Sequence, residues 1–458
     1  MALIKSISGI RGTIGGKIGD ALTPIDVVTL TASFGRWLLK QPSNKTVVIG
    51  RDARPSGPMI TRLVSATLQS LGISVIDLGL STTPTVAIAV PQEQACGGIV
   101  ITASHNPAGW NALKLLNRDG ELIDAAAAAE VFSIATQQNY PFVAADQLGR
   151  YTNREEYITK HIAQILALPL VDVPAIRSRK FSIAVDAVNS TGGIAVPQLL
   201  QALGVAHITA LNCEPNGQFP HDPEPLPAHL KELAHIVRSG THDLGLAVDP
   251  DVDRLVVIDE KGMPWGEEYT LALAADYVLR HTPGNTVSNL SSSQLLKDIT
   301  VQYGGHHAST PVGEQYVVAK MKATRAVIGG EGNGGVIYPT LHYGRDALVG
   351  IALLLSHLAH TEQTASALRA SYPDYVLVKY KIQLTSETNL ATLMEAIKKE
   401  YSAFPINTED GVKIMFGKAW IHLRRSNTEP IIRLYAEAAT EEQATYLATQ
   451  VMQQIKGL

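Results

Sequence analysis

The sequence predicts an α/β protein with several domains, and two observations support this fold class. Short β-branched apolar runs alternate with amphipathic helical runs along the whole chain, as they do in βαβ units with mostly parallel sheets. The chain also has 458 residues, which exceeds the roughly 250–300 residues beyond which one hydrophobic core stops growing. We therefore expect α/β domains in series.

Interruptions in this alternation divide the chain into four predicted domains. A polar stretch with little periodicity lies at 137–153, an acidic turn follows the strand-like run at 244–248, and Tyr372-Pro373 interrupts the pattern later in the chain. The predicted domains comprise residues 1–152, 153–255, 256–370 and 371–458. Each has a size that is usual for a domain.

Within these blocks, the spacing of apolar residues predicts the individual elements. The predicted strands are 46–50, 74–78, 99–101, 181–186, 244–248, 326–329, 376–382, 420–423 and 431–436. The predicted helices include 59–71, 271–279, 348–358 and 390–401.

The composition narrows the classes of protein. The chain is 45% apolar and 17% charged, which is typical of a folded enzyme or binding protein. Its formal net charge of −4 offers no polycationic surface, so we expect no nucleic acid partner. The two cysteines, Cys96 and Cys213, cannot form a disulfide framework, and the N-terminus lacks the apolar run of a signal peptide. We expect a cytoplasmic protein with no membrane partner.

Ser104 follows the strand-like run at 99–101, within the segment Thr-Ala-Ser-His-Asn-Pro. Ligands of open α/β sheets bind at the carboxyl ends of strands, so this hydroxyl is a candidate reactive group. The segment differs from the nucleophile elbow of serine hydrolases, because Thr102 and Asn106 occupy the positions that require glycine. An ordinary turn or a helix N-cap is the alternative.

The turn after the strand-like run at 244–248 contains three aspartates at alternate positions, Asp249, Asp251 and Asp253. Such close like charges repel one another unless a cation joins them, and carboxylate oxygens suit Mg²⁺ or Ca²⁺. An EF-hand calcium loop is disfavoured, because Arg254 occupies the position that requires glycine. Arg254 beside a bound cation indicates an anion such as phosphate between the two. A solvated acidic hairpin is the alternative.

Two further segments carry candidate ligand-binding residues. The glycine-rich stretch 329–335 lets the backbone approach a ligand closely, while Glu331 and Asn333 supply a carboxylate and an amide. It lacks the GxGxxG spacing of dinucleotide sites, and a simple turn is the alternative. The segment 424–430, Arg-Arg-Ser-Asn-Thr-Glu-Pro, is followed by Arg433 and concentrates donors that suit a dianionic phosphate. Here the alternative is a solvated basic turn.

Together these segments resemble the α-D-phosphohexomutases, the family of phosphoglucomutase, phosphomannomutase and phosphoglucosamine mutase. The serine segment, the acidic loop, the sugar loop and the phosphate loop occur in the family's order along essentially the whole chain. The resemblance implies three similar mixed α/β domains and a smaller C-terminal α+β domain around a central cleft. It also implies an isomerase that interconverts hexose 6-phosphate and hexose 1-phosphate through a phosphoserine and a sugar bisphosphate intermediate.

The resemblance also assigns roles to residues. Ser104 is the modified residue, a phosphoserine, and one Mg²⁺ per chain binds between it and the three aspartates. Lys114 or His105 is the acid/base. The residues around the transferring group are Arg11, His105, Lys114 and Arg254. The substrate-binding residues are Glu314, Glu331, Asn333, Arg424, Ser426, Asn427, Thr428 and Arg433. The expected partners are a hexose phosphate and a sugar bisphosphate activator, and the expected state is a monomer or homodimer.

Three positions depart from the family's pattern. Pro250 stands where the metal loop usually has glycine, which stiffens the turn and removes no ligand. Ala112 also replaces a usual glycine, and Asn333 replaces a usual serine of the sugar loop. Because an amide still hydrogen-bonds a hydroxyl, we expect sugar preference rather than binding itself to differ.

The segment 310–314, Thr-Pro-Val-Gly-Glu, resembles the glucosamine branch, which has an acidic residue after Val-Gly where the mannose/glucose branch has histidine. A carboxylate there favours a protonated amine, so the expected main reaction converts glucosamine 6-phosphate to glucosamine 1-phosphate. Phosphoglucomutase or phosphomannomutase activity is the alternative within the family. Outside mutase chemistry, the same segments are compatible with a phosphatase that hydrolyses its phosphoserine and with a non-catalytic sugar-phosphate-binding protein.

Overall fold

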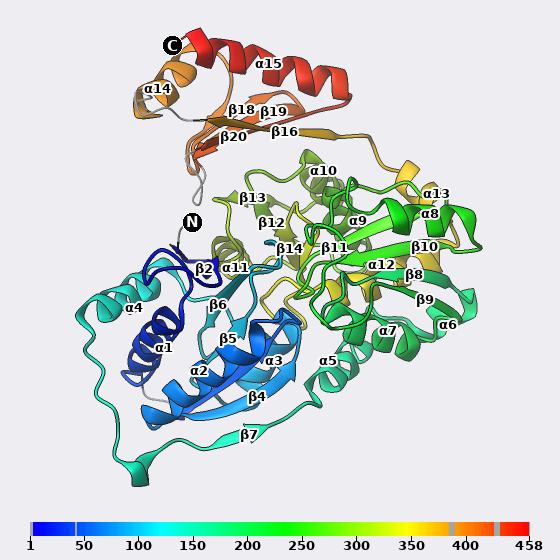
Figure 1. Cartoon of the computed structure of the whole chain (residues 1–458). Helices are drawn as coiled ribbons and strands as arrows, with labels where there is room; N and C mark the ends of the chain where they lie inside the picture. The colour runs from blue at the N-terminus through cyan, green and yellow to red at the C-terminus, as the bar shows by residue number, and fades with distance from the viewer. Residues whose placement is uncertain (1–2, 42–43, 384–389, 426–430, 458) are drawn as a thin grey trace.

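The computed structural model describes residues 3–41, 44–383, 390–425 and 431–457, which form four domains along the chain (Figure 1). Domains I to III each combine a mixed sheet with helices, and domain IV has an entirely antiparallel sheet. This arrangement confirms the predicted α/β class with a smaller C-terminal α+β domain. Among the described residues, no helix is both long enough and apolar enough to cross a membrane.

Domain I is built on a seven-stranded sheet in the order β1-β2-β6-β5-β3-β4-β7. Its strands are β1 (Ile4–Ser6), β2 (Gly9–Thr13), β3 (Thr46–Arg51), β4 (Ser74–Leu80), β5 (Gly97–Ile101), β6 (Trp110–Leu116) and β7 (Tyr151–Asn153). Its helices are α1 (Pro24–Leu38), α2 (Gly57–Ser70), α3 (Thr83–Gln92) and α4 (Ala125–Gln137). Ile49 packs towards α1, α2 and α4, whereas the preceding Val48 packs towards α3 on the other face. Burial on both faces explains why these strands are continuous apolar runs.

Domains II and III each contain a four-stranded sheet with one antiparallel edge strand, in the orders β11-β10-β8-β9 and β13-β12-β14-β15. Domain II comprises β8 (Ser182–Asp186), β9 (His207–Leu211), β10 (Leu244–Val248), β11 (Leu255–Asp259), α5 (Tyr157–Leu166), α6 (Val173–Arg179), α7 (Gly192–Leu203) and α8 (Lys231–Ser239). Domain III comprises β12 (Thr286–Asn289), β13 (His307–Thr310), β14 (Ile328–Glu331), β15 (Gly335–Ile337), α9 (Glu267–His281), α10 (Gln294–Gln302), α11 (Glu314–Thr324), α12 (Ala347–Thr361) and α13 (Ala365–Ala370).

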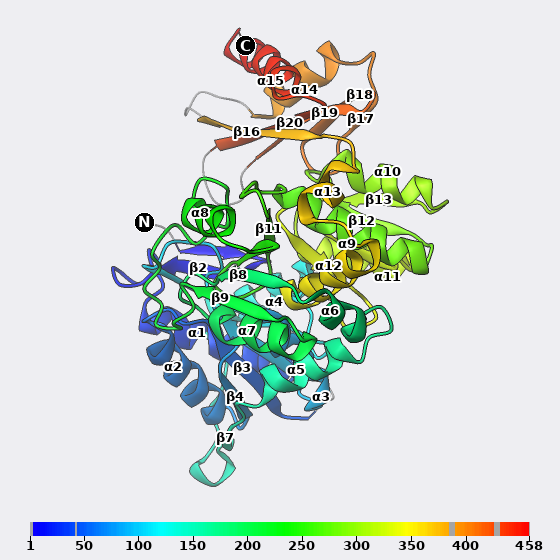
Figure 2. The same ribbon diagram turned by 90° about the vertical axis from the view of Figure 1, so that its right-hand side faces the viewer.

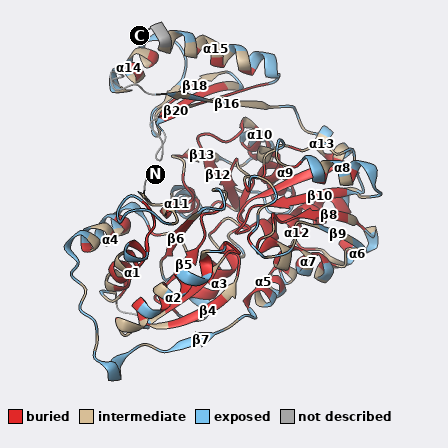
Figure 3. Ribbon diagram, viewed as in Figure 1, coloured by how far each residue is buried: buried red, intermediate tan, exposed pale blue. Residues whose placement is uncertain are grey.

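Domains II and III share one hydrophobic core. Helix α12 of domain III contacts α5, α6 and α7 of domain II, and one cluster of buried side chains contains Leu199 of α7 together with Leu353 of α12. The buried residues run through the sheets and α12 in Figure 3. The structure also differs from the predicted boundary between 255 and 256. All of β11 pairs with β10, because the acidic turn is the tip of a hairpin inside domain II.

Domain IV is a five-stranded antiparallel sheet in the order β16-β20-β19-β18-β17, with two helices on one face. Its elements are β16 (Val376–Gln383), α14 (Leu390–Glu400), β17 (Ile406–Asn407), β18 (Val412–Phe416), β19 (Ala419–Arg425), β20 (Ile431–Ala438) and α15 (Glu441–Gly457). Figures 1 and 2 both show α14 and α15 on the side of the sheet away from the other domains. Successive side chains of a strand point to opposite faces of the sheet. Ile421 and Leu423 pack against the helices, so Trp420, His422 and Arg424 lie on the other face, towards domain III.

Candidate active site

The predicted site segments are the tips of four hairpins, one in each domain. In domains I to III a parallel strand ends, a loop follows, and the chain returns as the antiparallel neighbour, from β5 to β6, β10 to β11 and β14 to β15. In domain IV, the consecutive strands β19 and β20 also pair antiparallel, but β19 has no parallel neighbour. The loop between them contains Ser426, Asn427 and Thr428, which lie outside the described residues. Glu331 is the last residue of β14 and Arg424 lies within β19, so neither is part of the turn that the sequence predicted.

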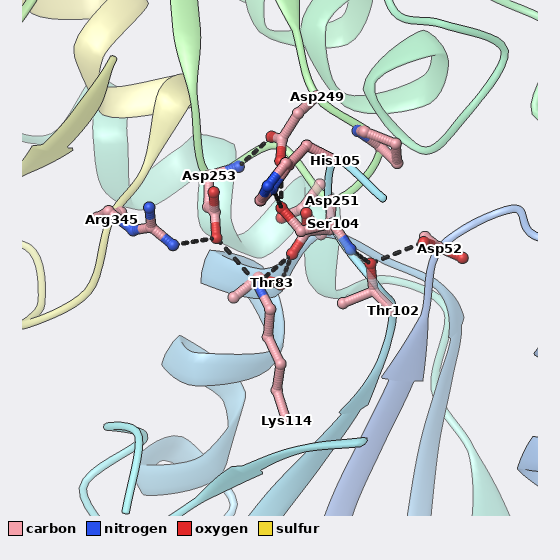
Figure 4. Close-up of polar contacts among 12 residues, drawn as sticks. Asp52, Thr83, Thr102, Ser104, His105, Lys114, Asp249, Asp251, Asp253 and Arg345 are labelled. Carbon is pink, nitrogen blue, oxygen red and sulfur yellow. Dashed lines mark hydrogen bonds and ion pairs between the residues drawn. The ribbon is translucent and has the colours of Figure 1, made fainter. Parts of the chain in front are cut away.

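Ser104 is held in a strained conformation at the end of β5. Its φ of +50° lies in the left-handed region, which a residue with a side chain rarely adopts. Its backbone N–H donates to Thr102 Oγ1 at 2.9 Å, and that hydroxyl donates to Asp52 at 2.7 Å. The Ser104 hydroxyl donates to Asp249 Oδ2 at 2.7 Å, so the reactive loop of domain I meets the acidic loop of domain II (Figure 4).

Arg54 binds the backbone of the loop that contains Ser104. Its side chain is fully buried, and its Nε pairs with Asp52 at 3.0 Å. Its other nitrogens donate to the carbonyl oxygens of Ser104, Asn106, Pro107 and Trp110. One guanidinium therefore binds the loop at both ends, which explains how a loop without regular structure holds one geometry.

The three aspartates form a buried cluster that fits a metal ion. One carboxylate oxygen from each can lie within 4.8 Å of the others, and all three residues are fully buried. Burial, followed by the charges of Asp251 and Asp253, raises the pKa of Asp249 well above its usual value. Asp251 Oδ1 and Asp253 Oδ1 have no hydrogen-bond partner within the described part of the chain. A hard divalent cation suits such oxygens and would offset their repulsion.

Lys114, on β6, points into the same cluster. Its Nζ lies 2.5 Å from Asp251 Oδ2 and 2.9 Å from Asp253 Oδ2 (Figure 4). Burial would lower the pKa of Lys114, but these two carboxylates raise it above its usual value. Lys114 therefore stays protonated in this arrangement.

Three further basic residues from the sequence prediction surround Ser104. Arg254 Nη2 donates to His105 Nδ1 at 2.8 Å, and Arg11 Nη1 donates to Asn106 Oδ1 at 3.2 Å. Burial, followed by the charges of Arg254 and Arg11, lowers the pKa of His105 well below its usual value, so its imidazole is neutral. The Nε atoms of Arg11 and Arg254 are buried and have no hydrogen-bond partner among the described residues, although Arg254 Nε lies 4.0 Å from Asp253 Oδ1. They are donors placed for an anion.

Arg345 joins the acidic loop to the residues predicted to bind the sugar. It comes from the loop before α12, and its guanidinium contacts Asp253 Oδ2 at 2.8 Å, Glu314 Oε2 at 2.8 Å and Glu331 Oε2 at 3.1 Å. Glu331 also accepts from the Asn289 amide and the Gly313 N–H. Glu314 is buried, which raises its pKa. Arg345 thus links both predicted glutamates to the aspartate cluster.

The remaining predicted residues lie further along the site. Asn333 is half-buried, and its Oδ1 has no partner within the described ranges. Arg424 and Arg433 are directly opposite each other on β19 and β20. The Arg424 Nε is buried and also lacks a partner among the residues that the structure describes.

Sequence reasoning did not assign roles to Arg54, Arg345 and Thr83. Thr83 begins α3, and its hydroxyl hydrogen-bonds Asp251 Oδ2. The Gly-Arg-Asp-Ala-Arg turn that contains Arg54 is visible in the sequence, but nothing there indicates which carbonyl oxygens it meets. Arg345 lies in a segment without a local motif, so only the fold places it.

Four models of the phosphoglucomutase/phosphomannomutase family match successive parts of the chain. Alpha/beta/alpha domains I, II and III match residues 3–141, 155–262 and 266–375, and the C-terminal domain matches residues 381–454.

Similar proteins cover the full length of the chain. A phosphoglucomutase/phosphomannomutase of Thermococcus kodakarensis is 35% identical over 94% of this chain and 95% of its own. A phosphoglucosamine/phosphogalactosamine mutase of Sulfurisphaera tokodaii is 32% identical over 100% of both chains. The crystal structure of a phosphoglucomutase/phosphomannomutase family protein from Burkholderia thailandensis superposes with a TM-score of 0.87 at 26% identity, covering 100% of this chain and 98% of that one. These matches give no support to the alternative of a non-catalytic binding protein. The chain therefore belongs to the phosphoglucomutase/phosphomannomutase family, the α-D-phosphohexomutases, and is an isomerase of that family.

Proposed function

We propose that this enzyme interconverts hexose 6-phosphate and hexose 1-phosphate with Ser104 as its phosphoryl carrier. One observation carries the proposal: in the described part of the chain, buried acceptors and buried donors without hydrogen-bond partners lie around a single hydroxyl. Asp251 and Asp253 offer carboxylate oxygens, whereas Arg11 and Arg254 offer N–H groups. A metal ion and a phosphoryl group on Ser104 would satisfy both sets.

The proposed reaction consists of two phosphoryl transfers, each of a different phosphoryl group. In the first transfer, the bond from phosphorus to Ser104 Oγ breaks and a bond to a hydroxyl oxygen of the hexose monophosphate forms. The product is a hexose bisphosphate, and the hydroxyl proton passes to a base of the enzyme. The bisphosphate then turns over in the site. The bond from its other phosphorus to the hexose oxygen breaks, a bond from that phosphorus to Ser104 Oγ forms, and the base returns the proton to the freed hexose oxygen. Arg11 and Arg254 stabilise the charge on the transferring group by position and by electrostatics.

Asp249, Asp251 and Asp253 would hold Mg²⁺ next to the phosphoryl group on Ser104. Bound there, the ion supplies positive charge that neutralises the transferring group. The Asp249 oxygen that accepts from the Ser104 hydroxyl at 2.7 Å brings the carrier to this cluster.

Two side chains are placed to move the hydroxyl proton. Lys114 is held protonated beside the acidic cluster, which suits a proton donor. His105 is neutral, which suits a proton acceptor, although its Nδ1 already accepts from Arg254. The acid/base is one of these two residues.

The sugar-binding residues of the proposal are Glu314, Glu331 and Asn333, with Arg424, Ser426, Asn427, Thr428 and Arg433 for the phosphate that does not react. The guanidinium of Arg345 contacts Glu314 and Glu331, and it also contacts Asp253 of the acidic loop. A sugar bound to the two glutamates would therefore lie close to Ser104, which contacts the same loop. The opposed pair of Arg424 and Arg433 supplies two positive charges at one end of domain IV.

Glucosamine 6-phosphate is the preferred substrate in this proposal, and glucosamine 1-phosphate is the product. The buried carboxylate of Glu314 supports it, because it stands where a protonated amine would be favoured. A relative named phosphoglucosamine/phosphogalactosamine mutase that matches the whole chain supports it as well. Phosphoglucomutase or phosphomannomutase activity is the second candidate, favoured by the relative from Thermococcus kodakarensis with that name.

A panel of hexose phosphates tests the proposal. The purified enzyme is assayed with Mg²⁺ and a hexose bisphosphate activator on glucosamine, glucose and mannose 6-phosphates, with each 1-phosphate product measured by a coupled reaction. The highest kcat/KM is expected for glucosamine 6-phosphate. Faster turnover of glucose or mannose phosphates would establish the second candidate, and release of inorganic phosphate without isomerisation would identify a phosphatase.

A further inference from the structure

A buried hydrogen-bonded chain lies next to the candidate site, where domains I, II and III meet. His161 of α5, in domain II, is at its centre and is fully buried. Its Nδ1 is 2.9 Å from Thr85 Oγ1 on α3 of domain I, and its Nε2 is 2.9 Å from Asp346 Oδ2 of domain III. Thr85 and Asp346 are also fully buried. One imidazole therefore bridges two other domains with both of its nitrogens.

The domain I end of this chain leads to Asp251. Thr85 lies in the first turn of α3, and its N–H donates to Thr82 Oγ1, the N-cap of that helix. Thr83 in the same turn donates its N–H to the carbonyl of Asp251 at 2.9 Å and its hydroxyl to Asp251 Oδ2. A shift of this turn would therefore move a partner of Asp251.

The domain III end leads to Asp253. Asp346 follows Arg345 directly, and its Oδ1 accepts from the Leu348 and Val349 N–H groups at the start of α12. Its Oδ2 accepts from His161 and also lies 3.2 Å from His342 Nε2. Burial would raise the pKa of Asp346, but His161 and His342 lower it below its usual value, so it is a carboxylate. Arg345, one residue earlier, contacts Asp253 and Glu331.

We infer that His161 is a positioning residue of the active site. Its two nitrogens join Thr85 to Asp346 and so hold Thr83 and Arg345, the partners of Asp251 and Asp253, at a set distance from each other. The inference rests on the proposed mutase reaction, because it assigns His161 a share in placing the residues of that reaction. Small displacements of such residues cost about ten- to a hundred-fold in rate.

Two polar substitutions of His161 test its bond to Thr85 and its bond to Asp346 separately. In His161→Gln the amide nitrogen takes the place of Nε2 and keeps the bond to Asp346, whereas in His161→Asn it takes the place of Nδ1 and keeps the bond to Thr85. Loss of the Asp346 bond should shift Arg345, which contacts Glu331 as well as Asp253, so His161→Asn should raise the KM for the hexose phosphate and lower kcat. Loss of the Thr85 bond affects Asp251 alone, so His161→Gln should lower kcat with KM unchanged.

The matched control is His357→Gln. His357 is also a buried histidine, stacked on Tyr277 and hydrogen-bonded to the Leu273 carbonyl, away from the acidic loop. The His357→Gln variant should have a lower thermal unfolding midpoint than the wild type, with kcat and KM at the wild-type values. Mg²⁺ binding measured by titration calorimetry is the second readout, and His161→Phe, which keeps neither bond, should bind Mg²⁺ about tenfold more weakly than His357→Gln.

The inference is overturned if the His161 variants keep wild-type kcat, KM and Mg²⁺ affinity while losing thermal stability as His357→Gln does. If they do not fold, Thr85→Val and Asp346→Asn carry the same two tests, and unchanged kinetics in both would overturn it. A wild-type enzyme that isomerises no hexose phosphate would contradict the proposed function instead. In that case the Mg²⁺ titrations of the same variants decide the role of His161.

Discussion

At the scale of single residues, buried charges shape the site more than any exposed group does. The guanidinium of Arg54 satisfies four carbonyl oxygens of the Ser104 loop and the carboxylate of Asp52, with no part of its side chain exposed. A lysine carries the same charge but cannot make this fork of bonds. The loop therefore depends on the shape of the group as well as on its charge.

Arg54→Lys should destabilise the enzyme by about 3 kcal/mol, because it leaves buried carbonyl oxygens without donors. Chemical denaturation with urea measures this change. Arg51→Lys is the control, since Arg51 is only half-buried and donates to a single carbonyl in the same turn. Equal unfolding free energies for the two variants would contradict the role of Arg54.

The sequence allowed some of these residues to be predicted and not others. Ser104 and the three aspartates stand in contiguous segments whose residue types carry their chemistry, so a local pattern was enough. Arg345 meets Asp253 only because β15 and α12 return it to the acidic loop, 92 positions along the chain. Contacts between distant segments follow from the packing of whole domains, which no local pattern contains.

At the scale of elements, the hairpin from β14 to β15 shows what the glycine-rich segment does. From the sequence, we interpreted these glycines as residues that let the backbone approach a ligand closely. In the structure they are required by the protein itself. A Cβ on Gly330, whose φ is +156°, would lie 2.0 Å from the Gly335 carbonyl oxygen, and one on Gly332 would lie 1.9 Å from the Glu268 carboxylate. The residue type was thus informative, but its physical reason is tight packing, across the hairpin at Gly330 and against α9 at Gly332.

Gly330→Ala should therefore destabilise the enzyme by about 2–3 kcal/mol through overpacking and backbone strain. Differential scanning calorimetry gives the unfolding midpoint. Gly109→Ala is the matched control, because a Cβ there would meet nothing within 4 Å. A Gly330→Ala variant as stable as Gly109→Ala would show that the hairpin tolerates a side chain.

At the scale of the whole molecule, polar bonds hold domain IV on domain III. Lys413 Nζ donates to the Leu290 carbonyl at 2.7 Å, His422 Nδ1 accepts from the Ser291 hydroxyl at 2.9 Å, and Asp410 accepts from the Val312 N–H at 3.0 Å. Lys413 and His422 come from the sheet face opposite α14 and α15, Asp410 comes from the turn between β17 and β18, and Figure 1 shows that face turned towards domain III. The sequence predicted the strands β16, β19 and β20 but not β17 and β18. It also did not show that the polar face of this sheet meets another domain, because a polar face is equally compatible with solvent.

This interface predicts a pH dependence of stability. Burial lowers the pKa of His422 to about 4, against the opposing effect of Asp410 and with Lys413 and Arg424 adding to it. Between that value and the usual pKa of about 6.5, the unfolded chain binds the proton and the folded one does not. The free energy of unfolding therefore loses nothing through His422 above about pH 6.5, and below that pH it should fall by about 1 kcal/mol per pH unit. Calorimetric scans between pH 7.5 and 5 test this, and His422→Gln should show a shallower decline than the wild type. An equally steep decline in that variant would assign the effect to other groups.

The role of Ser104 is tested most directly by the mass of the purified enzyme before and after incubation with a hexose bisphosphate. We expect the added mass of one phosphoryl group, located on the peptide that contains Ser104, and its loss on incubation with an excess of hexose monophosphate. Ser104→Ala should show neither the added mass nor isomerase activity. A fully active Ser104→Ala variant, or phosphate carried on another residue during turnover, would contradict the claim that Ser104 is the phosphoryl carrier.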